Sequence, residues 1–246
     1  MSEGTKRRCR QLSVQPLKEE ECLTVHSCSI VLLFVTASAQ SQIHYQSFRN
    51  TTGLNLVGGA TVVGNKIRLV PAQRDTRGNF WTQKAFPVAR GFHSSFAFRY
   101  SHQGGSKDGN GNPGNDGLLF YIQPVSNVLQ QNMEIPAKSL CIFFDGYKNN
   151  NVGDISSSRV EVLVNAQRIG QVDVEPLGIR FRDGRVVRAR VEYDGHCLTV
   201  FLNDKPVGTY KDVDLNEVSP GYVGFHGMGG DAYADVDVLN LHFDSL

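Results

Sequence analysis

The sequence contains little that would build a catalytic or cofactor-binding centre, and it carries almost no net charge. It has no CxxC, His-x-x-x-His or Cys/His cluster, which argues against a zinc site. It has no Ser-His-Asp arrangement and no Gly-rich phosphate loop. Its 25 Lys and Arg are balanced by 24 Asp and Glu, and this formal charge of +1 argues against a nucleic-acid partner held through its phosphates.

Long helices and membrane-spanning segments are also missing from the sequence pattern. No apolar period of 3.6 residues continues far enough for a substantial helix. The apolar run from Ile30 to Val35 is too short to cross a bilayer, and it is followed by Thr36-Ala37-Ser38-Ala39. This order is typical of a secretory signal cleaved after Ala39. We therefore expect a leader at residues 1–39 and a mature chain without a membrane span, located outside the cell or in the lumen of the secretory pathway.

Two features of the N-terminal part leave alternatives open. The segment before the apolar run, Met1 to Ser29, is long for a signal and mixes basic with acidic residues, so a misassigned start codon or an uncleaved anchor are alternatives. Of the five Cys, only Cys141 and Cys197 lie outside this leader, and the sequence does not show whether they pair or remain buried thiols. Asn50 begins an Asn-Thr-Thr sequon, which predicts a glycoprotein on the secretory route.

Short strands separated by turn residues are what the sequence does contain. From Phe92 to Tyr100, aromatic residues alternate with smaller or polar ones, which predicts a half-buried strand. The pairs Asp183-Gly184 and Asp194-Gly195 stand between alternating segments and predict hairpins. Ser101 to Asn115 and Gly227 to Ala232 are predicted as loops, the second of them mobile. Further strands are expected at Asn55–Ala60, Asn65–Val70, Leu118–Ile122, Cys141–Phe144, Arg159–Asn165, Ile179–Arg182 and its partner Val186–Tyr193, Cys197–Asn203, Gly221–Phe225 and Val236–Phe243. The pattern predicts an all-β antiparallel sandwich formed by residues 40–246 as one domain.

One loop of this pattern is rich in oxygen donors. It lies between the expected strands Cys141–Phe144 and Arg159–Asn165, and it carries Asp145, Asn149 and Asp154. Calcium takes about six to eight oxygen ligands from carboxylates, amides, backbone carbonyls and water. Because Asp and Asn also favour ordinary turns, a turn without a metal is the alternative.

The order of residues in this loop resembles the metal loop of the L-type (legume-type) lectins. An apolar residue and Phe precede Asp145, then Tyr147 and Asn149 follow, and Asp154 comes five residues later. The resemblance continues from about Ser47 to Leu246 and implies a concanavalin A-like jelly roll. It also implies a calcium ion held by Asp145, the Tyr147 carbonyl, Asn149 and Asp154. The phrase IFFDGYKN is similar to that of the animal cargo lectins of the secretory pathway.

Two positions depart from the pattern of the plant members. These hold a transition metal with a Glu two residues before the first Asp and a His five residues after the last. The corresponding residues here are Phe143 and Arg159, and neither ligates a divalent cation in its usual state. The resemblance therefore implies calcium without a second metal.

The same resemblance implies a sugar site and a non-enzymatic lectin. The residues expected to surround a glycan, or the glycan of a glycoprotein, are Asp116, Tyr147, Asn149, Gly230 and Asp231. Mannose- or glucose-type glycans are the expected ligands. Plant members also use a Gly that would fall between Ser126 and Ala137, where this sequence has none. Such shallow sites bind weakly, so useful avidity requires several of them, as a homo-oligomer would supply.

The sequence offers three alternative interpretations. Asp108, Asn110 and Asn112 follow the start of an EF-hand loop, but Pro113 and Leu119 occupy positions that need Gly and Glu. The segment Gln171 to Glu175 is similar to the catalytic strand of jelly-roll glucanases, but Gln171 cannot act as the nucleophile. A sandwich that serves in adhesion or as a structural module without binding sugar is the third, because a fold does not determine a function.

Overall fold

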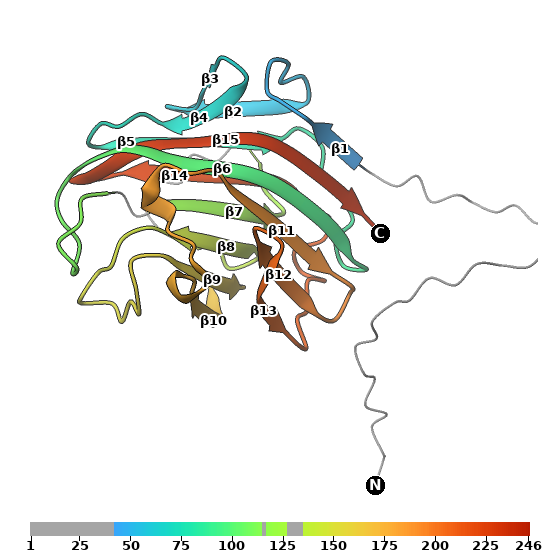
Figure 1. Cartoon of the computed structure of the whole chain (residues 1–246). Helices are drawn as coiled ribbons and strands as arrows, with labels where there is room; N and C mark the ends of the chain where they lie inside the picture. The colour runs from blue at the N-terminus through green and yellow to red at the C-terminus, as the bar shows by residue number, and fades with distance from the viewer. Residues whose placement is uncertain (1–41, 115–116, 127–134) are drawn as a thin grey trace, which may run out of the picture. The chain divides into compact units, whose positions relative to one another are not determined.

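The computed structural model describes residues 42–114, 117–126 and 135–246, which form two antiparallel β-sheets packed face to face (Figure 1). The predicted all-β sandwich is therefore confirmed. The predicted leader lies outside the described residues, as does Asp116. Within the described part of the chain, no helix is long and apolar enough to cross a membrane.

The first sheet has eight strands and includes both of the longest strands. Strands β6 (Phe92–Gly105) and β15 (Ala232–Ser245) run side by side along its centre, as the green and red arrows of Figure 1 show. The strand order is β13-β12-β11-β6-β15-β4-β3, and β1 also pairs with β15. The other strands are β1 (Gln42–Tyr45), β3 (Thr61–Val63), β4 (Lys66–Val70), β11 (Val187–Tyr193), β12 (Leu198–Leu202) and β13 (Lys205–Tyr210).

The second sheet has seven strands and carries the loop that is rich in oxygen donors. Its order is β10-β9-β8-β7-β14-β5-β2. The strands are β2 (Leu54–Gly58), β5 (Thr76–Thr82), β7 (Gly117–Gln123), β8 (Leu140–Asp145), β9 (Arg159–Val164), β10 (Gln167–Asp173) and β14 (Tyr222–Gly229). Strands β7 and β8 are buried along their whole length.

Aromatic side chains fill the space between the two sheets. The alternation predicted for β6 is observed, since Phe92, Phe96, Phe98 and Tyr100 are at most 2% exposed while His93 and Ser95 face solvent. The Phe96 ring lies 4.8–6.3 Å, centroid to centroid, from the rings of Phe98, Phe120, Phe144 and Phe225. Three of these partners belong to the facing sheet, so Phe96 joins β6 to β7, β8 and β14.

Several strand boundaries differ from the prediction. Ser101–Gly105 continues β6, and Gly227–Gly229 continues β14, because both segments find a neighbouring strand to pair with. Only Gly230 and Asp231 remain in the turn that was predicted to extend from Gly227 to Ala232.

The prediction of a hairpin at Asp183-Gly184 is wrong. Residues 179–182 do not form a strand, and Phe181–Asp183 is instead the 3₁₀ helix η2, which follows η1 (Glu175–Leu177). The Phe181 ring is fully buried and packs 5.6 Å from the Phe98 ring. The alternation at residues 179–182 therefore reflects side chains that close one edge of the core. The hairpin at Asp194-Gly195, by contrast, joins β11 to β12 as predicted.

The two cysteines outside the predicted leader are not joined to one another. Cys141 is a free thiol on the buried strand β8, and burial raises its pKa. Its sulfur therefore acts as a small apolar group in the sheet.

We expect Phe96→Ala to lower the free energy of unfolding by about 3–5 kcal/mol, because it opens a cavity among four aromatic rings. Urea unfolding followed by intrinsic fluorescence measures this loss. The control is Val62→Ala on β3, where the residue is 40% exposed, and it should change the stability by less than about 1 kcal/mol. A Phe96→Ala protein as stable as the wild type would contradict this account of the core.

Candidate functional site

Three loops emerge together at one end of the sandwich. Strand β7 lies between β8 and β14, and its first residue, Gly117, pairs with Asp145 of β8 on one side and with Met228 of β14 on the other. Two loops begin there, residues 146–158 and residues 230–231. A third loop, residues 106–114, follows the end of β6 and contacts both of them. We call these three loops the loop end.

Hydrogen bonds connect the three loops directly. The Tyr147 hydroxyl donates to the Lys107 carbonyl at 2.8 Å, and the Gly109 N–H donates to the Lys148 carbonyl at 2.9 Å. The Ser106 N–H donates to the Asp231 carbonyl at 3.1 Å. The segment 106–114 therefore bridges the donor-rich loop and the β14–β15 turn.

Two glycines allow the backbones to approach each other at this end. Gly117 has a φ of +134°, and a Cβ there would lie 2.2 Å from the Phe144 carbonyl oxygen. Gly105 has a φ of +80°, and a Cβ would lie 1.9 Å from the Asp231 carbonyl oxygen. Both positions require glycine for conformation and for space. The Asp-Gly motif before β7 thus has a structural reason for its Gly.

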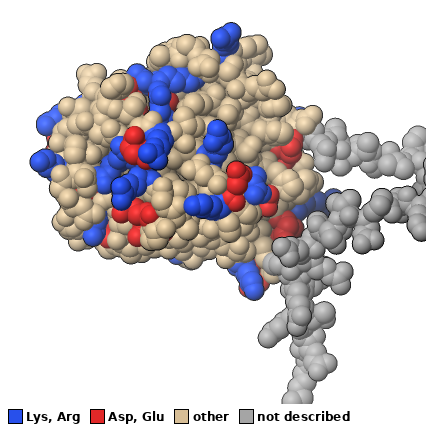
Figure 2. Space-filling model, viewed as in Figure 1, with Lys and Arg blue, Asp and Glu red and all other residues tan. Residues whose placement is uncertain are grey.

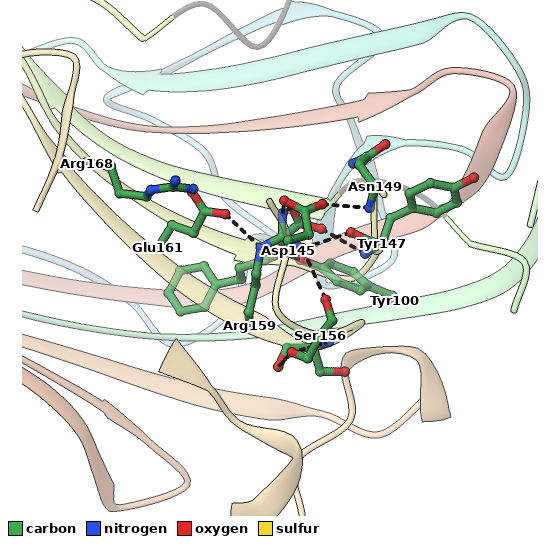
Figure 3. Close-up of polar contacts among 11 residues, drawn as sticks. Tyr100, Asp145, Tyr147, Asn149, Ser156, Arg159, Glu161 and Arg168 are labelled. Atoms are coloured by element: carbon green, nitrogen blue, oxygen red, sulfur yellow. Dashed lines mark hydrogen bonds and ion pairs between the residues drawn. The ribbon is translucent and has the colours of Figure 1, made fainter. Parts of the chain in front are cut away.

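The side chain of Arg159 occupies the centre of the donor-rich loop (Figure 3). Its Nη2 contacts a carboxylate oxygen of Asp145 and lies 2.6 Å from Oδ1 of Asp154. Its Nη1 donates to the Tyr147 carbonyl at 3.0 Å. Three of the four predicted calcium ligands therefore converge, but they converge on a guanidinium group.

A third carboxylate reaches Arg159 from its own strand. The Arg159 Nε donates to Oε1 of Glu161 at 2.7 Å, and Arg168 lies 3.3 Å from the other oxygen of Glu161. Glu161 stands directly opposite Phe143 in the β8–β9 pair, just as Arg159 stands opposite Asp145. The acidic side chain that is missing at Phe143 is therefore present across the strand pair.

The remaining oxygens of the loop carboxylates accept backbone hydrogen bonds. The Tyr147 N–H donates to Oδ1 of Asp145 at 2.8 Å, and the Asn149 N–H donates to Oδ2 of Asp154 at 2.6 Å. Calcium would need about six to eight oxygens at about 2.3–2.6 Å. With each of these carboxylate oxygens and the Tyr147 carbonyl already bound to an N–H group, the residues in this arrangement do not fit a calcium ion.

A second buried carboxylate fixes the neighbouring loop. Oδ1 of Asp108 accepts the N–H groups of Asn110 and Asn112, both at 2.9 Å. Its Oδ2 accepts the Ser157 hydroxyl at 2.6 Å and pairs with Arg182 at 2.8 Å. Burial opposes ionisation of Asp108, but these hydrogen bonds and the Arg182 charge outweigh it, so the Asp108 pKa lies below its ordinary value.

The Asp108 contacts also give a structural role to the residues that follow the start of an EF-hand pattern. The oxygen that an EF-hand would offer to calcium here receives backbone N–H groups of its own loop. Among the residues that the structure describes, no group of three or more His, Cys, Asp or Glu side chains is arranged to hold a metal. Beside this loop lies an open, polar cavity of about 480 Å³ lined partly by Asn110, Asn112 and Arg182.

The predicted sugar-contacting residues differ in their exposure. Tyr147 and Asn149 are half-buried, Gly230 has open space beside it, and the Asp231 side chain is 79% exposed and lies 3.3 Å from Arg74. Asp116 lies outside the described residues, although its neighbour Gly117 stands at the loop end. Sequence reasoning missed the roles of Arg159, Glu161 and Asp108. The available signal was a charged Arg at the position of an expected ligand.

The segment that is similar to a glucanase strand does not assemble a carboxylate pair. Gln171 and Asp173 lie on β10 at the edge of the second sheet, and Glu175 lies in the following 3₁₀ helix. The Asp173 carboxylate accepts the Glu175 N–H at 3.0 Å, which is a local turn contact.

Comparison with known proteins agrees with the sandwich fold. A family model described as the legume lectin domain matches residues 40–246. No curated protein sequence matches the chain.

Solved structures show the same fold at low sequence identity. The exoplasmic/lumenal domain of VIP36, in a form bound to Ca²⁺ and mannose, has a TM-score of 0.63 and 18% identity, covering 79% of this chain and 83% of that one. A lectin from Bauhinia forficata in complex with GalNAc has a TM-score of 0.65 and 20% identity, covering 84% and 98%. Arcelin-5, a lectin-like defence protein from Phaseolus vulgaris, has a TM-score of 0.65 and 19% identity, covering 84% and 98%.

We expect Asp108→Asn to destabilise the protein by about 2 kcal/mol at pH 7, because it leaves Arg182 without its charged partner. Since the Asp108 pKa is lowered in the folded state, the contribution of its charge is present above the unfolded pKa and is lost as the pH falls through the folded value. The difference between wild type and variant should therefore shrink below about pH 4.

Urea unfolding at pH 7, 5 and 3 measures this difference. The control, Asp212→Asn, changes a carboxylate that is 84% exposed, and we expect it to leave the stability nearly unchanged at each pH. An Asp108→Asn effect that is equally large at pH 3 would show that the ionised carboxylate is not what fixes this loop.

Proposed function

The chain belongs to the legume lectin domain family, and from this premise we propose that its loop end binds carbohydrate. The residues proposed to contact the sugar are Tyr147, Asn149, Gly230 and Asp231, together with Asp116 before β7. The observation that supports this most directly is that described loops from distant parts of the sequence, which carry the first four of these residues, are tied to one another by hydrogen bonds.

The chemistry of these side chains suits a neutral polyhydroxylated ligand. A half-buried Tyr147 offers an apolar ring face, while the Asn149 amide can donate and accept. The Tyr147 ring is held by its hydroxyl contact with Lys107, and the backbone at Asn149 is held by Asp154. A prearranged site reduces the entropy that is lost on binding.

The charge of the molecule agrees with a neutral ligand. On the face shown in Figure 2, basic and acidic side chains lie beside one another, with no broad area of one sign. The formal charge of +1 for the whole sequence agrees with this view. A surface of this kind gives little attraction for nucleic acid.

The identity of the sugar is proposed only as a class. Mannose- or glucose-type glycans remain the first expectation, and the VIP36 domain was solved with mannose. The Bauhinia forficata lectin was solved with GalNAc, so similar sandwiches take different sugars. A glycan array that includes mannosyl, glucosyl and N-acetylgalactosaminyl ligands separates these outcomes.

The proposed setting is the lumen of the secretory pathway or the extracellular space, where glycoproteins are available. The predicted signal at residues 1–39 and the sequon at Asn50 agree with it. Asn50 is exposed in the structure, as a glycan acceptor must be. We further propose that several copies act together, because single shallow sites bind weakly.

The sequence-based prediction also includes a calcium ion beside the sugar site. The VIP36 domain was solved in a Ca²⁺-bound form, and calcium at Asp145, Tyr147, Asn149 and Asp154 would orient the Asn149 amide toward the sugar. The contacts of Arg159 stand against this in the present arrangement. Calcium titration decides between the two and is described below.

The second candidate function is an adhesion or structural module that binds no sugar. Arcelin-5, which has a similar fold, is described as a lectin-like defence protein and not by a sugar that it binds. A shared fold does not by itself establish sugar binding. An enzyme is not a candidate, because the family is one of non-enzymatic carbohydrate-binding proteins. A glycan array on which the wild-type protein binds nothing would favour the module.

We expect Asp116→Asn to lower glycan affinity about ten- to a hundred-fold, because losing a charge-assisted hydrogen bond costs about 1.5–3 kcal/mol. The measurement is binding of the wild type and the variant to the ligand that the array identifies. The control is Asp212→Asn. Asp212 pairs with His196, which lies in the turn between β11 and β12, and this variant should bind like the wild type. Unchanged binding by a folded Asp116→Asn protein would place the sugar elsewhere.

A further inference from the structure

Arg159 is a buried cation at the point where the donor-rich loop rejoins the sheet. It is the first residue of β9, directly opposite Asp145, the last residue of β8. Its side chain is 2% exposed, and those of Asp145 and Asp154 are each 1% exposed. A charge in such a place needs charged or hydrogen-bonding partners on every side.

The guanidinium group joins both halves of the loop. Toward the beginning of the loop it contacts the Asp145 carboxylate and the Tyr147 carbonyl. Toward the end it contacts the Asp154 carboxylate and donates to the Ser156 carbonyl at 3.2 Å. A single side chain therefore contacts four groups of the loop.

We propose that the Arg159 guanidinium is the built-in cation of this loop and holds it in shape without a metal ion. The group supplies in one covalently attached side chain what a bound divalent ion would supply, namely positive charge at the meeting point of carboxylate and carbonyl oxygens. Its planar set of N–H donors matches such oxygens well.

The charges around Arg159 agree with this role. Three carboxylates, those of Asp145, Asp154 and Glu161, contact its guanidinium, and Arg168 supplies a second positive charge at Glu161. The negative charge that remains is stabilised by the N–H groups of Tyr147 and Asn149. A divalent ion placed among the same oxygens would lie against the fixed charge of Arg159 and would have to displace it.

Glu161 lies beside Arg159 on β9, and the register of the β8–β9 pair places both opposite residues of β8. Glu161 faces Phe143 across the β8–β9 pair, two residues along from the Asp145–Arg159 pair. A carboxylate on β9 therefore reaches the Nε of the Arg on the same strand, with Phe143 opposite. The acidic residue and the basic residue form one unit, since an isolated Glu161 at this depth would be costly.

The functional consequence rests on the proposed glycan binding. Tyr147 and Asn149 would hold their positions at the loop end without calcium, so sugar binding there should resist chelators. Failure of glycan binding altogether would count against the proposed function, whereas glycan binding that EDTA abolishes would count against the Arg159 proposal.

The first experiment uses the full chain purified through EDTA. Isothermal titration calorimetry with CaCl₂ and with MnCl₂ should show no specific binding, and the melting temperature should be the same in EDTA and in millimolar calcium or manganese. One-to-one calcium binding by the wild type, or a melting temperature that rises with calcium, would overturn the proposal.

The second experiment removes the guanidinium. Arg159→Ala should lower the melting temperature in EDTA by about 10 °C, because it leaves a cluster of buried carboxylates without their cation. Calcium should then restore part of that loss, since the variant exposes the oxygens that the guanidinium had covered. Arg159→Lys, which keeps the charge, should lose less stability and should respond less to calcium.

The matched control is Arg182→Ala, which removes the Arg partner of Asp108 in the neighbouring loop. It should also lose stability, but it frees only one carboxylate and should not respond to calcium. A folded Arg159→Ala protein that is indifferent to calcium would contradict the proposal. If Arg159→Ala does not fold in either condition, the wild-type titrations decide the question alone.

Discussion

The donor-rich loop depends on one buried contact, that between the Arg159 guanidinium and the carboxylates of Asp145 and Asp154. Loop 106–114 is tied to this loop by the Tyr147 hydroxyl and the Lys148 carbonyl, and its Ser106 N–H reaches Asp231 of the β14–β15 turn. Because Arg159 and both carboxylates are almost completely buried, water cannot replace a missing partner. The same side chains that keep the loop closed therefore determine where Tyr147 and Asn149 stand.

The sheets supply the geometry on which this contact rests. Asp145 and Arg159 meet because they are directly opposite each other at the ends of neighbouring strands. Tyr100 of the other sheet donates its hydroxyl to the Phe144 carbonyl at 2.6 Å, which fixes the backbone next to Asp145. The aromatic core below β8 thus reaches to within one residue of the loop.

Much of this architecture could be predicted from the sequence, because the strands of a sandwich repeat every two residues. The alternation in β6 and the Asp-Gly turn between β11 and β12 depend only on local order. The same local pattern gave a wrong strand at residues 179–182, where Phe181–Asp183 forms a 3₁₀ helix and the Phe181 ring packs into the core. Pairing is a property of the whole fold, so local alternation cannot decide it.

The donor-rich loop illustrates the same distinction at the level of chemistry. Its order of residues predicts that Asp145, Tyr147 and Asp154 converge on a cation, and in the structure they do. The order does not specify the cation, because carboxylate and carbonyl oxygens both accept hydrogen bonds from a guanidinium and coordinate calcium. What distinguishes the two is the residue that the neighbouring strand places opposite Asp145. An Arg at this position fills the centre of the loop with its own charge, and the fourth predicted ligand, Asn149, then joins the cluster through its backbone N–H.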